Sequence, residues 1–151
     1  MGRLLIVDQM HPDRTAVDQA VAALASGGVL VMPTDSVYGI GCAAQPGNPG
    51  HERIFAIKRR DRAQTLPWLI ADAGDLMRYA VDLTPASLAL ATAFWPGALT
   101  LVVRASEEVA PEYRSADGTI ALRLPNSNLV REIARRAGCA LAATSANTHG
   151  E

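Results

Sequence analysis

Apolar and polar residues alternate along this chain in short blocks, and the spacing within each block predicts strands and helices in turn. Short apolar runs predict strands at 4–7, 29–31, 40–44, 68–70, 99–103, 119–124 and 140–143. The strand at 29–31 is expected to be buried on both faces. Apolar residues at helical spacing predict helices at 17–24, 52–59, 72–79, 84–96 and 126–138. The interleaving predicts an α/β or α+β domain in which helices cover the strands.

Length and composition place the chain among folded proteins of one domain. It has 151 residues, 49% of them apolar and 19% charged, with neither an internal repeat nor a low-complexity linker. We therefore expect a single domain over 1–151. The chain stops soon after its last predicted strand, on a polar turn that could belong to a site, so we expect this domain to lack its C-terminal part.

Charge and hydropathy narrow the classes of function. The 14 basic and 15 acidic residues give a formal charge of −1, which argues against binding nucleic acid over the whole surface. An anion site would have to be local. No apolar run approaches the roughly 20 residues that span a bilayer, and the first residues do not resemble a signal peptide. We therefore predict a cytoplasmic protein without a membrane partner.

The segment PTDSVYGIG at 33–41 is the strongest local signal of a binding site. A buried strand ends at Pro33, and hydroxyl and carboxylate side chains follow at Thr34, Asp35 and Ser36. Two glycines downstream allow positive φ or the close approach of a ligand. Taken alone, the segment could also be an ordinary connection between two strands.

Three further segments carry candidate chemistry, and each has a plainer alternative. The basic run from Lys58 to Arg62 could bind a polyphosphate, or could complement the C-terminal dipole of a helix. Arg123 lies in an apolar strand, so its guanidinium must meet a carboxylate of the protein or of a ligand. The small polar residues at 143–147 could contact phosphate oxygens, or could form a simple turn.

Other familiar sites are not recognisable in the sequence. It contains neither the dinucleotide fingerprint G-x-G-x-x-G nor a P-loop. Its three histidines lack metal-ligand spacing, so we expect no protein-bound metal. A catalytic triad is not recognisable either. Cys42 and Cys139 are expected to be buried small side chains.

Five motifs, taken in order, resemble the YrdC/Sua5 family, the threonylcarbamoyl-AMP synthases of tRNA t6A modification. They lie at 33–41, 54–60, 95–100, 121–125 and 144–147. The resemblance covers nearly the whole chain. It implies the YrdC/RibB-like fold, a twisted mixed sheet flanked by helices in three layers. It also implies adenylyl transfer, in which L-threonine, bicarbonate and ATP give threonylcarbamoyl-AMP and pyrophosphate.

The resemblance also assigns roles to residues. Thr34, Arg123 and the backbone near Ala143 would contact threonine, and Lys58 and Arg60 would act on the phosphates as catalytic groups. The nucleotide would further be bound by Arg62, Thr119, Ser145 and Asn147. Mg²⁺ would accompany ATP, held largely by phosphate oxygens and water. A separate threonylcarbamoyl transferase would use the product, and a weak contact with tRNA or double-stranded RNA is compatible with this role.

The chain departs from the family pattern, and two other functions stay open. The family commonly has glutamate and threonine where this chain has Asp35 and Ser36, and a proline where it has Asp61. One alternative is a carbamoyl-adenylate-forming domain of the hydrogenase-maturation type. The other is a module that binds tRNA or double-stranded RNA without catalysis, which the low aromatic content of 5% makes less favourable.

Overall fold

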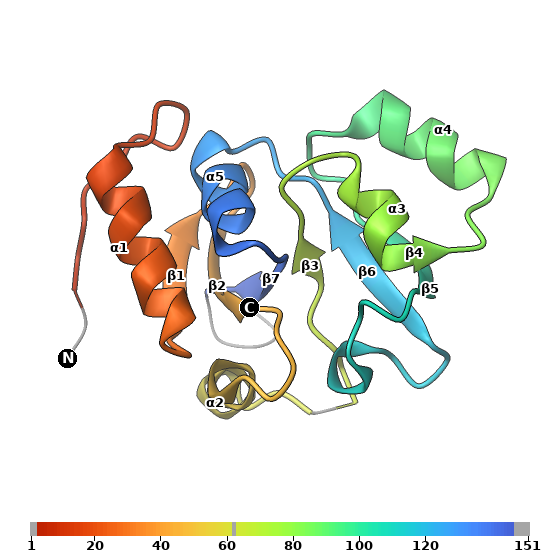
Figure 1. The fold of residues 1–151 in the computed structure, drawn as a ribbon, viewed down its shortest axis with the longest axis horizontal. Helices are drawn as coiled ribbons and strands as arrows, with labels where there is room; N and C mark the ends of the chain where they lie inside the picture. The colour runs from red at the N-terminus through yellow and green to blue at the C-terminus, as the bar shows by residue number, and fades with distance from the viewer. Residues whose placement is uncertain (1–2, 62, 147–151) are drawn as a thin grey trace.

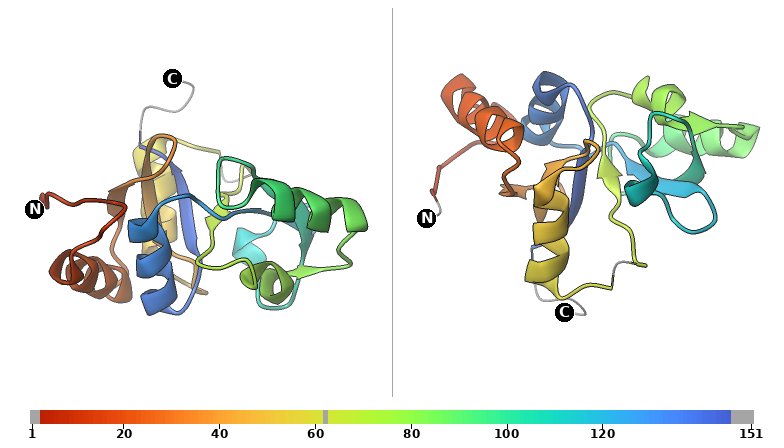
Figure 2. Two further views of the ribbon diagram at one scale, coloured as in Figure 1. Left: turned by 90° about the horizontal axis from the view of Figure 1, so that it is seen from above. Right: turned by 60° about the horizontal axis from the view of Figure 1, so that its bottom comes forward.

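A seven-stranded mixed sheet forms the centre of the protein, and helices cover it. The computed structural model describes residues 3–61 and 63–146. The strands follow the order β1-β2-β7-β3-β6-β5-β4. Helices α1 and α5 pack on one face of the sheet and α2 lies on the opposite face (Figures 1 and 2). This arrangement confirms the expected three-layer fold with a mixed sheet.

The elements alternate along the chain as the apolar pattern predicts. The helices are α1 (Arg14–Ala25), α2 (Pro49–Lys58), α3 (Asp75–Tyr79), α4 (Pro85–Phe94) and α5 (Asn128–Ala137), with a short 3-10 turn at Pro111–Tyr113. The strands are β1 (Leu30–Pro33), β2 (Tyr38–Ala43), β3 (Trp68–Leu69), β4 (Ala80–Val81), β5 (Leu101–Ala105), β6 (Thr119–Arg123) and β7 (Leu141–Ser145). None of the helices in the described parts of the chain is long and apolar enough to cross a bilayer.

Strand β3 joins the two parts of the sheet, although it has only two residues. Trp68 and Leu69 pair in parallel with β6 and antiparallel with β7. All other strand pairs are antiparallel. One further backbone hydrogen bond extends the joint on each side, from Ile70 N to Arg123 O at 2.9 Å and from Ala143 N to Pro67 O at 3.0 Å.

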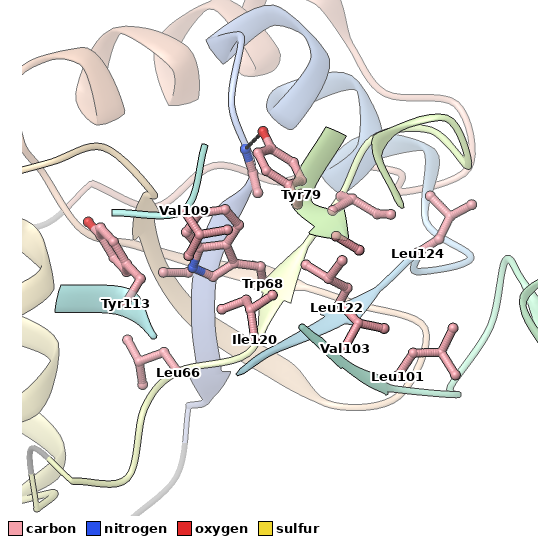
Figure 3. Close-up of a cluster of buried hydrophobic side chains, with 14 of the residues drawn as sticks. Leu66, Trp68, Tyr79, Leu101, Val103, Val109, Tyr113, Ile120, Leu122 and Leu124 are labelled. Atoms are coloured by element: carbon pink, nitrogen blue, oxygen red, sulfur yellow. Dashed lines mark hydrogen bonds between the residues drawn. The ribbon is translucent and has the colours of Figure 1, made fainter. Parts of the chain in front are cut away.

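Two apolar clusters, one on each face of the sheet, hold the layers together. The first joins α1 and α5 to the sheet through residues such as Val17, Leu24, Val130, Ile133 and Leu141. The second is built around Trp68, whose ring meets those of Tyr79 and Tyr113 edge to face at 5.0 and 5.4 Å (Figure 3). The burial of so many large side chains stabilises a domain of this size without cross-links.

Helix ends follow local sequence signals. Ser127 caps α5 by accepting a hydrogen bond from Val130 N at 3.4 Å, and Thr84 caps α4 by accepting one from Ser87 N at 3.1 Å. Helix α5 ends at Gly138, whose φ of 77° places it in the left-handed region. These caps agree with the helix limits predicted from the sequence.

Two strand predictions are wrong. Residues 4–7 do not form a strand, and the side chains of Leu4 and Ile6 are 92% and 97% exposed. Strand β1 is not buried on both faces, because Met32 packs into the cluster that α1 and α5 form on one face whereas Val31, on the other face, is 64% exposed. In both cases the apolar run predicts extended backbone or burial, but the strands that pair with it and the helices that cover it decide the outcome, and the local pattern does not contain them.

Candidate functional site

A small pocket opens where the β1–β2 loop meets β7, β3 and β6. Its volume is about 130 Å³, and it is lined by Thr34, Ser36, Val37, Gly39, Pro67, Leu69, Thr100, Arg123, Ala143, Thr144 and Ser145. The register explains the convergence, because Gly39 pairs with Ser145 and Leu69 pairs with Arg123. The pocket thus brings together four predicted site residues, namely Thr34, Arg123, Ala143 and Ser145.

The β1–β2 loop, residues 34–37, owes its shape to its own hydroxyl groups. Thr34 Oγ1 donates a hydrogen bond to Val37 O and accepts one from Ser36 N at 3.3 Å. The Thr34 and Ser36 hydroxyls lie 3.2 Å apart. Such side-chain bonds to nearby backbone groups form a compact turn. The loop therefore presents Thr34 and Ser36 to the pocket in a fixed arrangement.

Of the two glycines in this segment, Gly41 is the one that packing requires. A Cβ atom at Gly41 would lie 2.9 Å from Met32 Cε and 3.1 Å from both Ala142 O and Ala143 Cβ. A Cβ atom at Gly39 would meet nothing closer than 3.6 Å. Neither glycine has positive φ. The predicted positive φ is thus wrong for both glycines, and at Gly41 strand neighbours fill the space that a ligand was expected to approach.

The Arg123 guanidinium meets a protein carboxylate, which was one of the two alternatives raised by the sequence. Its side chain is 11% exposed and forms an ion pair with Asp35. Nε donates to Gly97 O at 2.9 Å, and Nη1 donates to Ser36 Oγ at 3.3 Å. The second carboxylate oxygen of Asp35 accepts a hydrogen bond from Asn126 N at 2.8 Å. Arg123 thus connects β6, the β1–β2 loop and the turn at 95–97.

Arg60 connects the predicted basic cluster to the pocket. Its Nη1 donates to Thr144 Oγ1 at 3.2 Å, and Thr144 lines the pocket. Nε and Nη2 donate to Gln64 O and Thr65 O at 2.7 and 3.0 Å. Burial lowers the pKa of Arg60, but an arginine remains charged at neutral pH. A cation is therefore held beside Thr144 and Ser145.

Among the described residues, Lys58 and Thr119 are predicted site residues that do not line this pocket. Lys58 is the last residue of α2 and is 5% exposed. Thr119 begins β6 at the opposite end from Arg123, and its hydroxyl donates to Asp117 Oδ1 at 2.6 Å. Arg62 and Asn147 lie outside the described residues. The nucleotide role of these four residues stays a prediction.

Asp35 and Thr144 are the contacts that the sequence did not identify. Asp35 is 88 positions from Arg123, and Thr144 is 84 positions from Arg60. The position of Arg123 in an apolar strand was a signal that some carboxylate had to lie nearby, because an unpaired buried guanidinium is costly. Nothing in the local sequence, however, indicated which carboxylate it was.

Comparisons with known proteins identify relatives of this chain. A family model for Sua5, YciO and YrdC, described as "Telomere recombination", matches residues 22–151. A relative from Pseudoalteromonas translucida named threonylcarbamoyl-AMP synthase is 33% identical over 142 residues, which cover 92% of this chain and 75% of the relative.

Solved structures with the same fold extend the comparison. Sua5 from P. abyssi in complex with L-threonine superposes with a TM-score of 0.87 at 30% identity, covering 97% of this chain and 44% of that chain. E. coli YciO superposes with a TM-score of 0.90 at 25% identity, covering 100% of this chain and 73% of that chain. This chain therefore spans less than half of the Sua5 structure.

The hydrogenase-maturation alternative is supported only by a similarity of fold between this chain and HypF. HypF in its phosphate- and nucleotide-bound form superposes with a TM-score of 0.73 at 14% identity, over 21% of its length. The match of the family model, by contrast, covers most of the chain and includes all five motifs read from the sequence. The chain belongs to the Sua5/YciO/YrdC family.

Proposed function

We propose that this domain forms threonylcarbamoyl-AMP and pyrophosphate from L-threonine, bicarbonate and ATP. The observation that carries the proposal is the pocket, which brings Thr34, Arg123, Ala143 and Ser145 together from three distant segments, the β1–β2 loop, β6 and β7. A relative that is 33% identical is named for this product, and a related structure binds L-threonine. The product would pass to a separate transferase that modifies tRNA in the cytoplasm.

The pocket suits the amino acid better than the nucleotide. Its volume of about 130 Å³ is below the roughly 300 Å³ at which pockets for drug-sized ligands begin. Arg123 offers a planar guanidinium, and a carboxylate can accept two parallel hydrogen bonds from such a group. Thr34 and Ser36 add hydroxyl groups on the facing wall. Threonine would lie here with its carboxylate towards Arg123.

ATP would lie on the side of the pocket marked by Arg60. This cation is next to Thr144 and Ser145, at the end of β7. Lys58, Arg62, Thr119 and Asn147 complete the proposed nucleotide contacts. The described residues hold no group of three His, Cys, Asp or Glu side chains that could bind a metal ion. We therefore propose that Mg²⁺ enters with ATP, coordinated mainly by phosphate oxygens and water.

The chemistry needs positioning and charge neutralisation more than a protein nucleophile. The amine of threonine attacks the carbon of bicarbonate, a C–O bond breaks with loss of water, and a carbamate forms. A carbamate oxygen then attacks the α-phosphorus of ATP, and pyrophosphate leaves. Cations beside the triphosphate would stabilise the charge that develops on the departing oxygens. This role fits Arg60, with Lys58 as the second predicted catalytic cation.

Pyrophosphate release from ATP tests the proposal on the 151-residue chain. We expect release that requires both threonine and bicarbonate, with threonylcarbamoyl-AMP identified by mass spectrometry. Release without threonine would refute the proposal, and release on addition of carbamoyl phosphate would favour the hydrogenase-maturation type of chemistry. Salt-dependent binding of double-stranded RNA in a chain that binds no ATP would favour the module without catalysis.

A further inference from the structure

Within the described part of the chain, Asp35 is the one carboxylate that pairs with Arg123, and it joins three segments beside the pocket. It lies in the β1–β2 loop and pairs with Arg123 at the end of β6. Its second oxygen accepts the backbone N–H of Asn126, just before α5, at 2.8 Å. The Asp35 side chain is only 15% exposed. Both oxygens are therefore engaged in a largely shielded place.

These contacts determine how the guanidinium can meet a ligand. A guanidinium has five N–H donors, and Gly97 O, Ser36 Oγ and Asp35 accept from three different nitrogens of Arg123. The group is thereby held at all three nitrogens, while one N–H remains on each Nη. Arg123 also lines the pocket. A ligand carboxylate can thus be received by a cation whose direction is already set.

We propose that Asp35 is a positioning residue of the amino-acid pocket. Its carboxylate holds the Arg123 guanidinium in the orientation that receives the carboxylate of the ligand, and it pins the 34–37 loop as the facing wall. The identity of the ligand rests on the function proposed above. Asp35 itself contacts no ligand and acts through Arg123 and Thr34.

Both oxygens of Asp35 matter, and this makes asparagine an informative substitution. An amide of the same shape has a single acceptor oxygen, so it can serve either Arg123 or Asn126 N, but not both. The negative charge beside Arg123 is also lost. Glutamate keeps the charge and both acceptors but is one methylene longer. The order expected for threonine affinity is therefore wild type, then Asp35→Glu, then Asp35→Asn.

Calorimetric titration of the 151-residue chain with L-threonine, and separately with Mg·ATP, tests this order. We expect Asp35→Asn to weaken threonine binding by about tenfold, as losses of supporting contacts typically do, and Asp35→Glu to recover part of the loss. The ATP affinity should change less than about twofold, because Asp35 is placed on the amino-acid side. A change of threonine and ATP affinity by equal factors would indicate a merely structural role and overturn the proposal.

The matched control is Asp18→Asn, which removes a carboxylate from the exposed Asp18–Arg136 pair between α1 and α5. We expect it to leave both affinities unchanged. Unchanged or tighter threonine binding in Asp35→Asn would also overturn the proposal, since Asp35 would then be idle or a competitor for Arg123. Should Asp35→Asn fail to fold, Asp35→Glu carries the same comparison.

Hydrogen exchange separates this inference from the proposed function. The amide of Asn126 should be protected in the wild type and should exchange at least several times faster in Asp35→Asn, whether or not a ligand is present. A wild-type chain that binds no threonine would refute the proposed function alone. If the exchange rate at Asn126 is the same in Asp35→Asn as in the wild type, the positioning role of Asp35 is refuted, whichever ligands the chain binds.

Discussion

Arginines line both a pocket and a groove of this protein, and the two sites differ in the hydrogen-bond and ion-pair partners of these arginines. The pocket beside Arg123 has a volume of about 130 Å³. A wider groove of about 570 Å³ lies between α1 and α5. It is lined by Pro12, Arg14, Val17, Asn128, Arg131, Glu132, Arg135 and Arg136. Volume and the number of arginines would both select the groove, yet the predicted threonine-site residues meet in the smaller pocket.

Three of the four arginines of the groove, Arg131, Arg135 and Arg136, form ion pairs with acidic neighbours. Arg135 pairs with Asp72 at 2.9 Å and with Glu132 at 2.6 Å, and its side chain is 45% exposed. Arg136 pairs with Asp18. Arg123, by contrast, is 11% exposed and is held by atoms from three separate segments. Under the proposed function, shielding and convergent partners separate Arg123, the proposed binding cation, from arginines that only connect two surfaces.

The largest expected effect is at Arg123. Arg123→Lys keeps the charge but loses the planar fork and the bond to Gly97 O, so we expect threonine affinity to fall by about 100-fold. Calorimetry with threonine measures the change, and circular dichroism checks the fold. Wild-type affinity in a folded variant would break the comparison, because Arg123 would then be structural like the arginines of the groove.

An intermediate effect is expected at Arg60. Arg60→Ala removes the cation beside Thr144, and we expect the affinity for Mg·ATP to fall by about tenfold, with a smaller change for threonine. The salt dependence of ATP binding should also weaken. Fluorescence titration with an ATP analogue at two salt concentrations measures both quantities. Equal losses for ATP and threonine would instead show that Arg60 mainly shapes the loop through Gln64 and Thr65.

The smallest effect is expected in the groove, at Arg135. Arg135→Ala should leave both ligand affinities unchanged and lower the free energy of unfolding by less than about 1 kcal/mol, because the pairs are exposed. The hydrogen bond from Arg135 lowers the pKa of Asp72 below its ordinary value of 3.8.

The pH dependence of this pair has a definite sign. A carboxyl with a lowered pKa stabilises the folded state above its ordinary value, and the contribution is lost as the pH falls through the folded-state pKa. The stability difference between wild type and Arg135→Ala should therefore be constant near neutrality and shrink below pH 3.8, as urea unfolding at several pH values can measure. A loss of ligand binding in Arg135→Ala would contradict the comparison, because the groove would then also bind a ligand.

Local signals in the sequence predicted the type and limits of single elements better than they predicted which elements pair with one another. The caps at Thr84 and Ser127 and the stop at Gly138 depend on residues within one helical turn, and the sequence contains them side by side. The strand expected at 4–7 depends on a partner strand, and no local signal supplies one. Element type was therefore predictable where the contacts are local.

The site followed the same division. The sequence alone required a carboxylate for Arg123, and the resemblance pointed to Thr34 and Ser145. The partner Asp35 and the bond from Arg60 to Thr144 are products of tertiary folding, with 88 and 84 positions between the paired residues. A single residue in the sequence can show that an ionic partner is required, but the topology of the sheet determines which residue provides it.

The brevity of β3 has a mechanical consequence. Thr34, in the β1–β2 loop, and Ser145, in β7, lie on one side of β3, and Arg123, in β6, lies on the other side. The pocket lies across this short joint, whose two residues on β3 are supported by one further backbone hydrogen bond on each side. The Asp35–Arg123 ion pair is a side-chain link over the same joint, so it ties the β1–β2 loop to β6 where few backbone hydrogen bonds connect the two parts of the sheet.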